Sequence, residues 1–245
     1  MCGRFTLTTD LDAAALAALF GAQSRVRELR PRYNIAPTQP TVAVLVEHDR
    51  RVLDTFRWGL LPAWARDRSI ASRLINARAE TLERRSAFRD AFSSRRCLIP
   101  SDGFYEWGGR ERTPHWIRLR EGAPFAYAGL YERRAGAARD DGTASGTFTI
   151  VTTEPNELVG SLHGRMPVII PPGSYDRWLD PSWSAAELRA LLRPYPAAKM
   201  TMRPVARTVN HAAAEGPECV LPASATSTGT HANLELFEEG THGKT

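Results

Sequence analysis

Short runs of β-branched and aromatic residues, separated by polar turns, dominate the pattern along the chain. Thr41–Glu47 and Val52–Trp58 are two such runs joined by a short polar segment, which predicts a hairpin. Further runs of the same kind predict strands at Cys97–Pro100, Gly103–Trp107, His115–Arg120, Pro124–Tyr131, Thr147–Thr153, Val168–Ile170 and Met202–Asn210. The pattern therefore predicts a chain rich in short strands.

Helical patterns are fewer. The sequence predicts a helix over Asp10–Phe20, capped by Thr9 or Asp10 and ended by Gly21. The other predicted helices run from Thr81 to about Phe92, with Leu82, Phe88 and Phe92 on the apolar side, and over Glu154–Leu162, Tyr175–Leu179 and Ala185–Leu192. Pro37 and Pro40 are incompatible with a helix, so Arg32–Thr38 is predicted as an ordered loop, and Arg133–Gly146 as a flexible one.

Composition excludes several classes of protein. No run of about 18 apolar residues occurs, and the N-terminus lacks the basic and apolar pattern of a signal peptide. The three cysteines, Cys2, Cys97 and Cys219, are too scattered for a disulfide framework or a zinc site. We therefore expect a cytoplasmic, reduced protein with no membrane span, no metal and no cofactor.

The charge is uneven along the chain. The net charge is +5, but the tail from Ala223 to Thr245 carries three acids and one base. Only Lys199 and Lys244 are lysines, so 30 of the 32 basic residues are arginines. The arginine-rich part of the chain before the tail, residues 1–222, suits phosphate binding, because guanidinium groups match phosphate oxygens. A GC-rich genome would produce the same bias toward arginine. The tail is rich in Ser, Thr, Gly and His and is predicted to be disordered.

The first residues carry chemistry that no internal residue offers. Removal of Met1 would expose Cys2 with a free α-amine beside its thiol. The amine has an ordinary pKa of about 7.7–8.0, so much of it is neutral and nucleophilic near pH 7. An amine and a thiol two carbons apart condense with an aldehyde into a five-membered thiazolidine. Taken alone, Met1-Cys2 favours an ordinary start in a disordered terminus, and the other motifs change that interpretation.

Two further residues stand out by their surroundings. Glu106 lies among Phe104, Tyr105 and Trp107 in a predicted strand, where it either is buried with a raised pKa or faces solvent. His163 lies between a predicted helix end and Gly164, an exposed position that suits proton transfer as well as a structural role. No internal repeat, CxxC pair, phosphate-binding glycine loop or GxSxG motif occurs, which argues against nucleotide hydrolysis, zinc chemistry and serine-hydrolase chemistry.

Six motifs, in order, resemble the SOS-response-associated peptidase (SRAP) family of abasic-site processing proteins. They are Met1–Arg4, Tyr33–Thr38, Trp58–Leu60, Asn76–Thr81, Cys97–Pro100 with Gly103–Trp107, and His163–Pro167. The resemblance covers residues 1–222 as a single domain and leaves out the tail, 223–245. It implies an α+β fold built on a strongly bent, largely antiparallel, barrel-like β-sheet with peripheral helices.

The resemblance also implies the function. The family captures abasic sites in single-stranded DNA covalently, which would make this chain a DNA-damage-response protein. We expect a monomer, because the sequence leaves no amphipathic stripe to explain. By motif, Cys2 would be the nucleophile, and Asn76, Glu106 and His163 the polar residues around it. The DNA-binding residues would be Arg4, Pro37, Thr38, Trp58, Leu60, Arg78 and Arg165. The arginines would contact phosphates, and Pro37, Trp58 and Leu60 would pack against bases.

Two other functions stay open at this stage. Cys2, His163 and Asn76 superficially resemble the set of a thiol peptidase, although proteolysis does not require a terminal amine. A non-catalytic single-strand or RNA-binding module would use the arginines and aromatics alone, and salt would fully reverse its binding.

Overall fold

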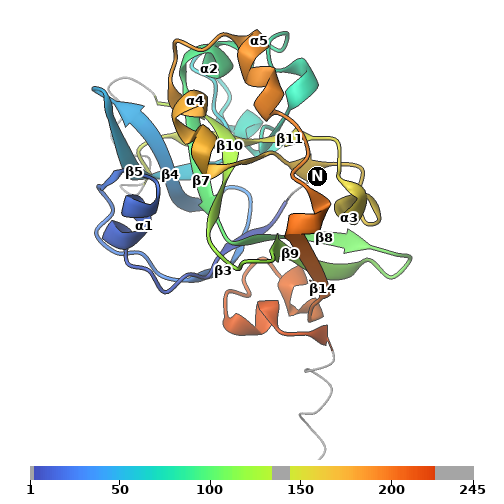
Figure 1. Cartoon of the computed structure of the whole chain (residues 1–245). Helices are drawn as coiled ribbons and strands as arrows, with labels where there is room; N and C mark the ends of the chain where they lie inside the picture. The colour runs from blue at the N-terminus through green and yellow to red at the C-terminus, as the bar shows by residue number, and fades with distance from the viewer. Residues whose placement is uncertain (1–2, 134–143, 224–245) are drawn as a thin grey trace, which may run out of the picture.

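The computed structural model describes residues 3–133 and 144–223, whose strands form two sheets (Figure 1). The smaller sheet has the strand order β14 (Met200–Pro204), β9 (Thr113–Leu119), β8 (Gly103–Gly108), β1 (Phe5–Leu7) and β3 (Arg32–Ile35). The larger sheet has the order β12 (Met166–Pro167), β11 (Thr147–Thr153), β10 (Phe125–Glu132), β7 (Arg96–Ser101), β4 (Pro40–Glu47), β5 (Arg50–Trp58) and β2 (Gln23–Ser24). In addition, β13 (Ile169–Ile170) pairs with β10, and β6 (Asn76–Arg78) pairs with β11.

The larger sheet curves back on itself. Its strand β11 also pairs with β5, in parallel, through Thr147 opposite Arg57 and Phe148 opposite Trp58. This pairing closes β11, β10, β7, β4 and β5 into a ring whose other pairings are antiparallel. The expected α+β fold around a bent, largely antiparallel, barrel-like sheet is confirmed.

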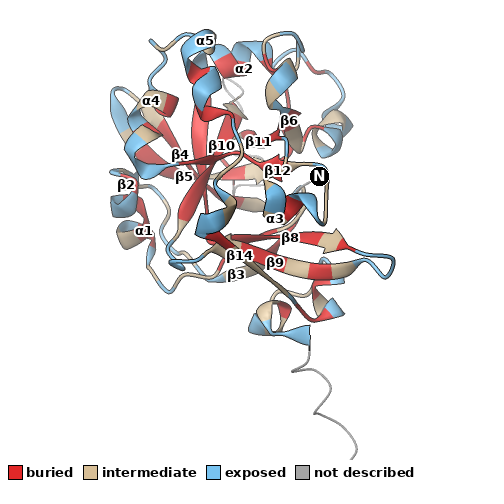
Figure 2. Cartoon of the chain, turned by 45° about the vertical axis from the view of Figure 1, so that its right-hand side comes forward, coloured by how far each residue is buried: buried red, intermediate tan, exposed pale blue. Residues whose placement is uncertain are grey.

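Short helices surround the sheets. They are α1 (Ala13–Leu19), α2 (Arg89–Ser94), α3 (Glu157–Gly160), α4 (Tyr175–Leu179) and α5 (Ala185–Leu188). In Figure 1, α2, α4 and α5 lie at one end of the larger sheet, and α3 lies toward β8. Figure 2 shows that the strands are mostly buried while the helices expose their outer faces. No helix among the described residues is long and apolar enough to cross a bilayer.

Aromatic side chains join the two sheets. The ring of Trp58 meets Phe5 of β1 edge to face at 5.1 Å and stacks on Phe148 of β11 at 6.3 Å between centroids. Its indole N–H donates to the carbonyl of Ile75 at 2.8 Å, so the polar atom of this buried ring is satisfied. The start of the chain is thereby packed against the barrel.

Several predicted elements are confirmed. The hairpin forms as β4 and β5, joined by His48 and Asp49 with positive φ of 47° and 61°. Thr147–Thr153 and Tyr175–Leu179 have the bounds that the pattern predicted. The first helix is shorter than predicted, because Asp12 rather than Thr9 or Asp10 caps it.

Three local predictions were wrong. The strand predicted at Met202–Asn210 ends at Pro204 in β14, and Arg207–Asn210 form a 3₁₀ helix instead. The helix predicted from Thr81 to Phe92 is mostly absent, with a 3₁₀ helix at Ala79–Thr81 and α2 only from Arg89. Leu82, Phe88 and Phe92 are buried, as predicted, but largely from an irregular segment. The loop predicted at Arg32–Thr38 begins as strand β3, because Pro37 restricts only the residues next to it and β1 offers a partner. Most of the predicted loop 133–146 and of the tail 223–245 lies outside the described residues.

The carboxylate of Asp102, just before β8, fixes the neighbouring strand β1 within the smaller sheet. It accepts from the Thr6 hydroxyl at 2.5 Å and from the Thr8 amide and hydroxyl at 2.5 and 2.7 Å, and it is buried. Replacing Asp102 by Ala removes the acceptor of the Thr8 amide and hydroxyl, while the Thr6 hydroxyl keeps the Gly103 carbonyl at 3.2 Å, so we expect a loss of about 2–3 kcal/mol in the free energy of unfolding. Urea denaturation would measure the loss. The exposed Asp10→Ala is the control, and an Asp102 variant as stable as the control would contradict this role.

Candidate active site

Glu106 lies on β8 on the face that points toward the barrel. Side chains alternate along a strand, so Glu106 shares a face with Phe104, which belongs to the main core, while Tyr105 packs in a separate cluster. The residue is only 3% exposed. Burial raises the pKa of the Glu106 carboxyl above its ordinary value, and the nearby His163 opposes that rise. Of the two sequence interpretations, the buried carboxyl is confirmed.

His163 follows α3 and lies close to Glu106 of β8. Its amide donates to the carbonyl of Val159 at 2.9 Å, which continues the turn of α3, and its Nδ1 lies 3.9 Å from Oε1 of Glu106. Gly108 of β8 lies against the residue before His163, since a Cβ there would lie 2.3 Å from the end of the Leu162 side chain. His163 keeps 33% of its side chain exposed, so the pair combines a buried acid with an accessible imidazole.

Asn76 and Arg78 lie on β6, which pairs in parallel with β11 through Asn76 opposite Ile150. Ala77 between them is fully buried, so Asn76 and Arg78 point away from the core on a shared face. Asn76 is half-buried and Arg78 is exposed. Strand β11 also pairs with β12 on its other side, which places Thr152 between Arg78 and Pro167. The motifs Asn76–Thr81 and His163–Pro167 therefore flank strand β11 on its two edges.

The N-terminal strand runs beside Glu106. Phe5 pairs with Phe104, and the Tyr105 amide donates to the carbonyl of Arg4 at 3.0 Å. Because the strands are antiparallel, each step back toward Gly3 is a step along β8 toward Glu106. The predicted nucleophile, Cys2, lies outside the described residues.

Comparison with known proteins decides the family. The profile described as SOS response associated peptidase (SRAP) matches residues 1–212. The chain belongs to this family. It is 38% identical over 224 residues to the abasic site processing protein YoqW of Bacillus subtilis, a match that covers 90% of this chain and 99% of that protein. It is 40% identical over 214 residues to YoaM of the same organism, likewise named an abasic site processing protein, covering 86% of this chain and 93% of YoaM.

Solved structures agree with the family. A crystal structure of a protein from Bacteroides thetaiotaomicron is 29% identical to this SRAP chain and superposes with a TM-score of 0.79. The match covers 91% of this chain and 100% of the other. A structure from Bordetella bronchiseptica, 27% identical, gives a TM-score of 0.67 over 84% of this chain and 100% of the other.

Two of the predicted base-contacting residues of this SRAP chain need correction. Trp58 and Leu60 are 0% exposed, so neither can stack on or wedge against a base. Trp58 instead supports the predicted DNA-binding turn, because its carbonyl accepts from the Thr38 amide at 2.8 Å. Thr38 is exposed with a positive φ of 71°, and Pro37 beside it is half-buried.

The predicted arginines differ in accessibility. Arg78 is exposed, as a phosphate contact requires. Arg4 donates to Asn34 Oδ1 at 2.8 Å and to the carbonyl of Val209 at 2.7 Å, so it anchors the C-terminal segment, and the phosphate role predicted for it is not supported. Arg165 forms two hydrogen bonds with the Glu80 carboxylate, at 2.5 and 3.0 Å.

Glu80 is the residue of this region that sequence reasoning missed. It lies within the motif Asn76–Thr81, but the sequence analysis gave it no role of its own. Only the fold reveals that the side chain of Arg165 reaches it across the end of β11. Among the described residues, no group of three or more His, Cys, Asp or Glu side chains is placed to hold a metal ion.

Proposed function

We propose that this chain processes abasic sites in single-stranded DNA and captures them covalently as a thiazolidine on Cys2, once Met1 has been removed. Its relatives YoqW and YoaM carry the name of abasic site processing proteins, and the family match begins at the first residue. In this proposal residues 1–222 act as a single monomeric domain on DNA in the cytoplasm. The tail, 223–245, takes no part in the chemistry.

The observation that carries the proposal is the pair of Glu106 and His163 beside the strand that leads to the N-terminus. A carboxyl that is 3% exposed and 3.9 Å from an accessible imidazole suits proton transfer. The hydrogen bond from the Tyr105 amide to the Arg4 carbonyl holds the described end of the N-terminal segment beside β8, and this supports a role for the residues before it. A peptidase needs no alignment of a terminal amine, and a simple binder needs no buried acid.

The proposed reaction releases one molecule of water. Glu106, whose pKa is raised by burial, would act as the general acid that assists opening of the sugar hemiacetal to the aldehyde. The Cys2 amine adds to C1′, and loss of water gives an imine. The thiol sulfur then adds to the imine carbon while its proton passes to the nitrogen, which closes the thiazolidine ring. His163 moves protons between these groups, and Asn76 orients the amine or a sugar hydroxyl.

The imine also allows a side reaction. Loss of a proton from C2′ would eliminate the 3′ phosphate, so weak lyase activity is part of the proposal. Ring closure removes the imine and so protects the strand. Arg78 would hold a phosphate, and the turn at Pro37 and Thr38 would contact the neighbouring nucleotides.

The test is a denaturing gel combined with intact-mass measurement. Protein confirmed to start at Cys2 is mixed with a single-stranded oligonucleotide carrying one abasic site, beside an undamaged control. We expect a species whose mass equals the sum of protein and oligonucleotide less one water, only with the lesion. No adduct under these conditions would refute the proposal. Cleavage of a peptide library would then favour the peptidase, and salt-reversible binding the simple binder.

A further inference from the structure

Strands β8 and β9 form a hairpin whose tip projects from the smaller sheet. The pairing ends with Gly108 opposite Thr113, so the tip consists of residues 109–112. Gly109 and Arg112 have positive φ of 72° and 49°, and the Arg112 amide donates to the Gly109 carbonyl at 3.2 Å, so the tip is a closed turn. Figure 2 shows that this tip is exposed and extends beyond α3.

The tip borders the candidate active site. Gly108 shares a face of β8 with Glu106, two residues earlier, because side chains alternate along a strand. On this face Gly108 lies against the side chain of Leu162, and Glu106 lies 3.9 Å from the imidazole of His163. The hairpin tip therefore continues the wall of the site on the side of Leu162.

The tip carries two exposed arginines, Arg110 and Arg112. The acid between them, Glu111, forms its ion pair with Arg207 at 2.9 Å. Within the part of the chain that the structure describes, neither Arg110 nor Arg112 has a carboxylate in ion-pair contact. The tip thus presents positive charge to solvent, and the pair with Arg207 connects it to the 3₁₀ helix Arg207–Asn210.

Arg112 faces the site electrostatically. Burial raises the pKa of the Glu106 carboxyl, and the positive charge of Arg112 is one of the influences that oppose this rise. A charge influences a carboxyl in this way only at short range, because the interaction weakens with distance and with screening. The Arg112 guanidinium therefore lies on the side of the hairpin that faces the buried acid.

The turn 162–165 separates Arg112 from Arg78. One end of this turn lies against the hairpin. At its other end the Arg165 guanidinium donates to the carbonyl of Thr152 at 2.6 Å, and Thr152 pairs with Arg78 of β6. The buried acid and the accessible imidazole lie between the two exposed arginines. A nucleotide in the site carries a phosphate on either side of its sugar, and this arrangement places one arginine toward each.

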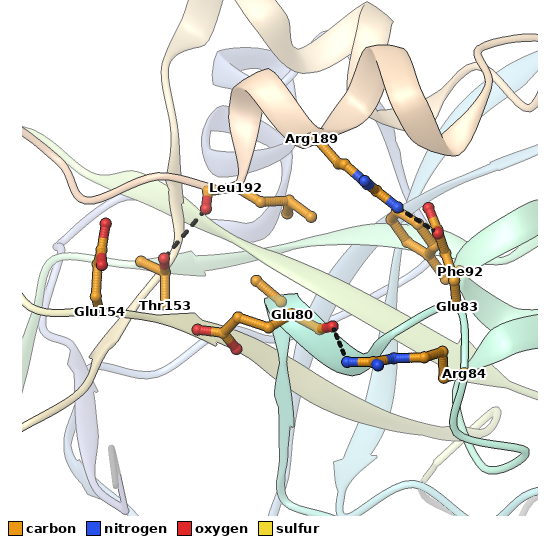
Figure 3. A pocket seen from close by; sticks show the side chains of 9 residues that line it. Glu80, Glu83, Arg84, Phe92, Thr153, Glu154, Arg189 and Leu192 are labelled. Carbon is orange, nitrogen blue, oxygen red and sulfur yellow. Dashed lines mark hydrogen bonds and ion pairs between the residues drawn. The ribbon is translucent and has the colours of Figure 1, made fainter.

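The cavity beyond β6 does not suit a phosphate. It has a volume of about 560 Å³, and Figure 3 shows the carboxylates of Glu80, Glu83 and Glu154 around it. Of the two arginines that also line it, Arg84 and Arg189, the second already pairs with Glu83 at 2.6 Å. Carboxylates repel a phosphate backbone, so the hairpin tip is the better path for the strand.

We propose that Arg112 is a DNA-binding residue, which contacts a backbone phosphate on the side of the captured nucleotide opposite to Arg78. The inference rests on the proposed function, which supplies the single strand. Guanidinium groups match phosphate oxygens in charge and geometry. Arg112 lies outside the six motifs that resemble the family.

The first measurement is the equilibrium affinity for an undamaged single-stranded oligonucleotide, which has no aldehyde to react. We expect Arg112→Gln to weaken binding roughly 5- to 10-fold, the scale of one charged hydrogen bond at an exposed position. The slope of log affinity against log salt should fall by about 0.7, the value for one phosphate of a single strand. Arg112→Lys keeps the charge and should keep most of the affinity. Equal losses in both variants would indicate a damaged tip and contradict the proposal.

The chain supplies a matched control at another hairpin. Arg50 is exposed at the start of β5, and it lines a separate cavity with Gly21 and Asp176. Arg50→Gln is expected to stay within about twofold, the scale of a lost surface charge. If Arg112→Gln bound as tightly as Arg50→Gln, the proposal would be wrong. Unchanged affinity with an altered pH profile of adduct formation would show that Arg112 acts only on Glu106, and would equally overturn it.

The second measurement locates the phosphate. The oligonucleotide carries a tetrahydrofuran abasic analogue, which cannot form an imine, and a neutral methylphosphonate at one linkage on either side of it. We expect one linkage whose neutralisation weakens binding of the unaltered protein but not of Arg112→Gln. A linkage on the other side should behave likewise with Arg78→Gln. The same linkage for both variants would refute the opposite placement. A protein that gives these binding results but forms no adduct with abasic DNA would refute only the proposed capture.

Discussion

A Cys2→Ala variant is expected to form no denaturant-stable adduct with abasic DNA. The rate of adduct formation should fall by at least about 100-fold, as expected when an essential group is removed. Alanine is small enough to permit removal of Met1, so the variant keeps the α-amine and loses only the thiol. An amine alone forms an imine, which water reverses. The thiazolidine needs the sulfur, and no other described cysteine is suited to replace it.

The two internal cysteines are both buried. Burial raises the pKa of the Cys97 thiol far above its ordinary range, which keeps it protonated and unreactive. Cys97→Ala is therefore the control, and it is expected to form the adduct if its melting temperature shows that it is folded. Adding borohydride to the Cys2→Ala reaction should trap the imine, and strand cleavage should increase because ring closure no longer competes.

The readout is again the denaturing gel with intact mass, which also verifies that Met1 is absent. A Cys2→Ala adduct that survives denaturant without borohydride would show that the thiol is not needed and would refute ring closure. A Cys2→Ala protein that traps nothing with borohydride would show that its retained α-amine forms no imine, and would refute the first step of the proposed reaction.

The fold was predictable where local signals suffice. The strands β4 and β5 follow from two β-branched runs with a short polar turn, and both the turn and the pairing are local. The segment after Thr81 was misjudged, because Leu82, Phe88 and Phe92 are buried by tertiary packing rather than by helix periodicity.

The sequence offers the candidate site as a set of residues but not as a geometry. Motifs indicated Asn76, Glu106 and His163, but the pairing of β6 with β11 joins residues about seventy positions apart in sequence, which no local pattern reveals. Trp58 shows the same limit. An aromatic residue beside Gly59 and Leu60 is typical of a core more often than of a ligand platform, and the closed barrel around Trp58 shows that it belongs to the core.

A Glu106→Gln variant is expected to lose adduct formation by roughly 100- to 1,000-fold, the range for a lost general acid or base. Glutamine keeps the shape of the side chain and its capacity for hydrogen bonds, but it cannot give up or take a proton. The single-turnover rate against abasic DNA measures this loss. Glu121→Gln, at an exposed position between β9 and β10, is the control for charge and should react normally.

The same variant is expected to be more stable than the unaltered protein at neutral pH. Burial raises the pKa of Glu106, so the folded protein holds this proton more tightly than the unfolded chain does. Stability therefore falls as the pH rises from the ordinary glutamate pKa through the raised one, and above that window the cost of burying the charge is complete. Glutamine avoids this cost.

We expect a melting temperature roughly 2–4 °C higher for Glu106→Gln at neutral pH, which corresponds to about 1 kcal/mol in the free energy of unfolding for a chain of this size. This advantage should vanish below the ordinary glutamate pKa. Thermal melts across this pH range would measure both trends. A variant that is slower but less stable at neutral pH would mean that compensating contacts hold the Glu106 carboxylate in its charged form. A gain in stability together with the loss of rate would show that the fold carries this carboxyl for its chemistry and at the expense of stability.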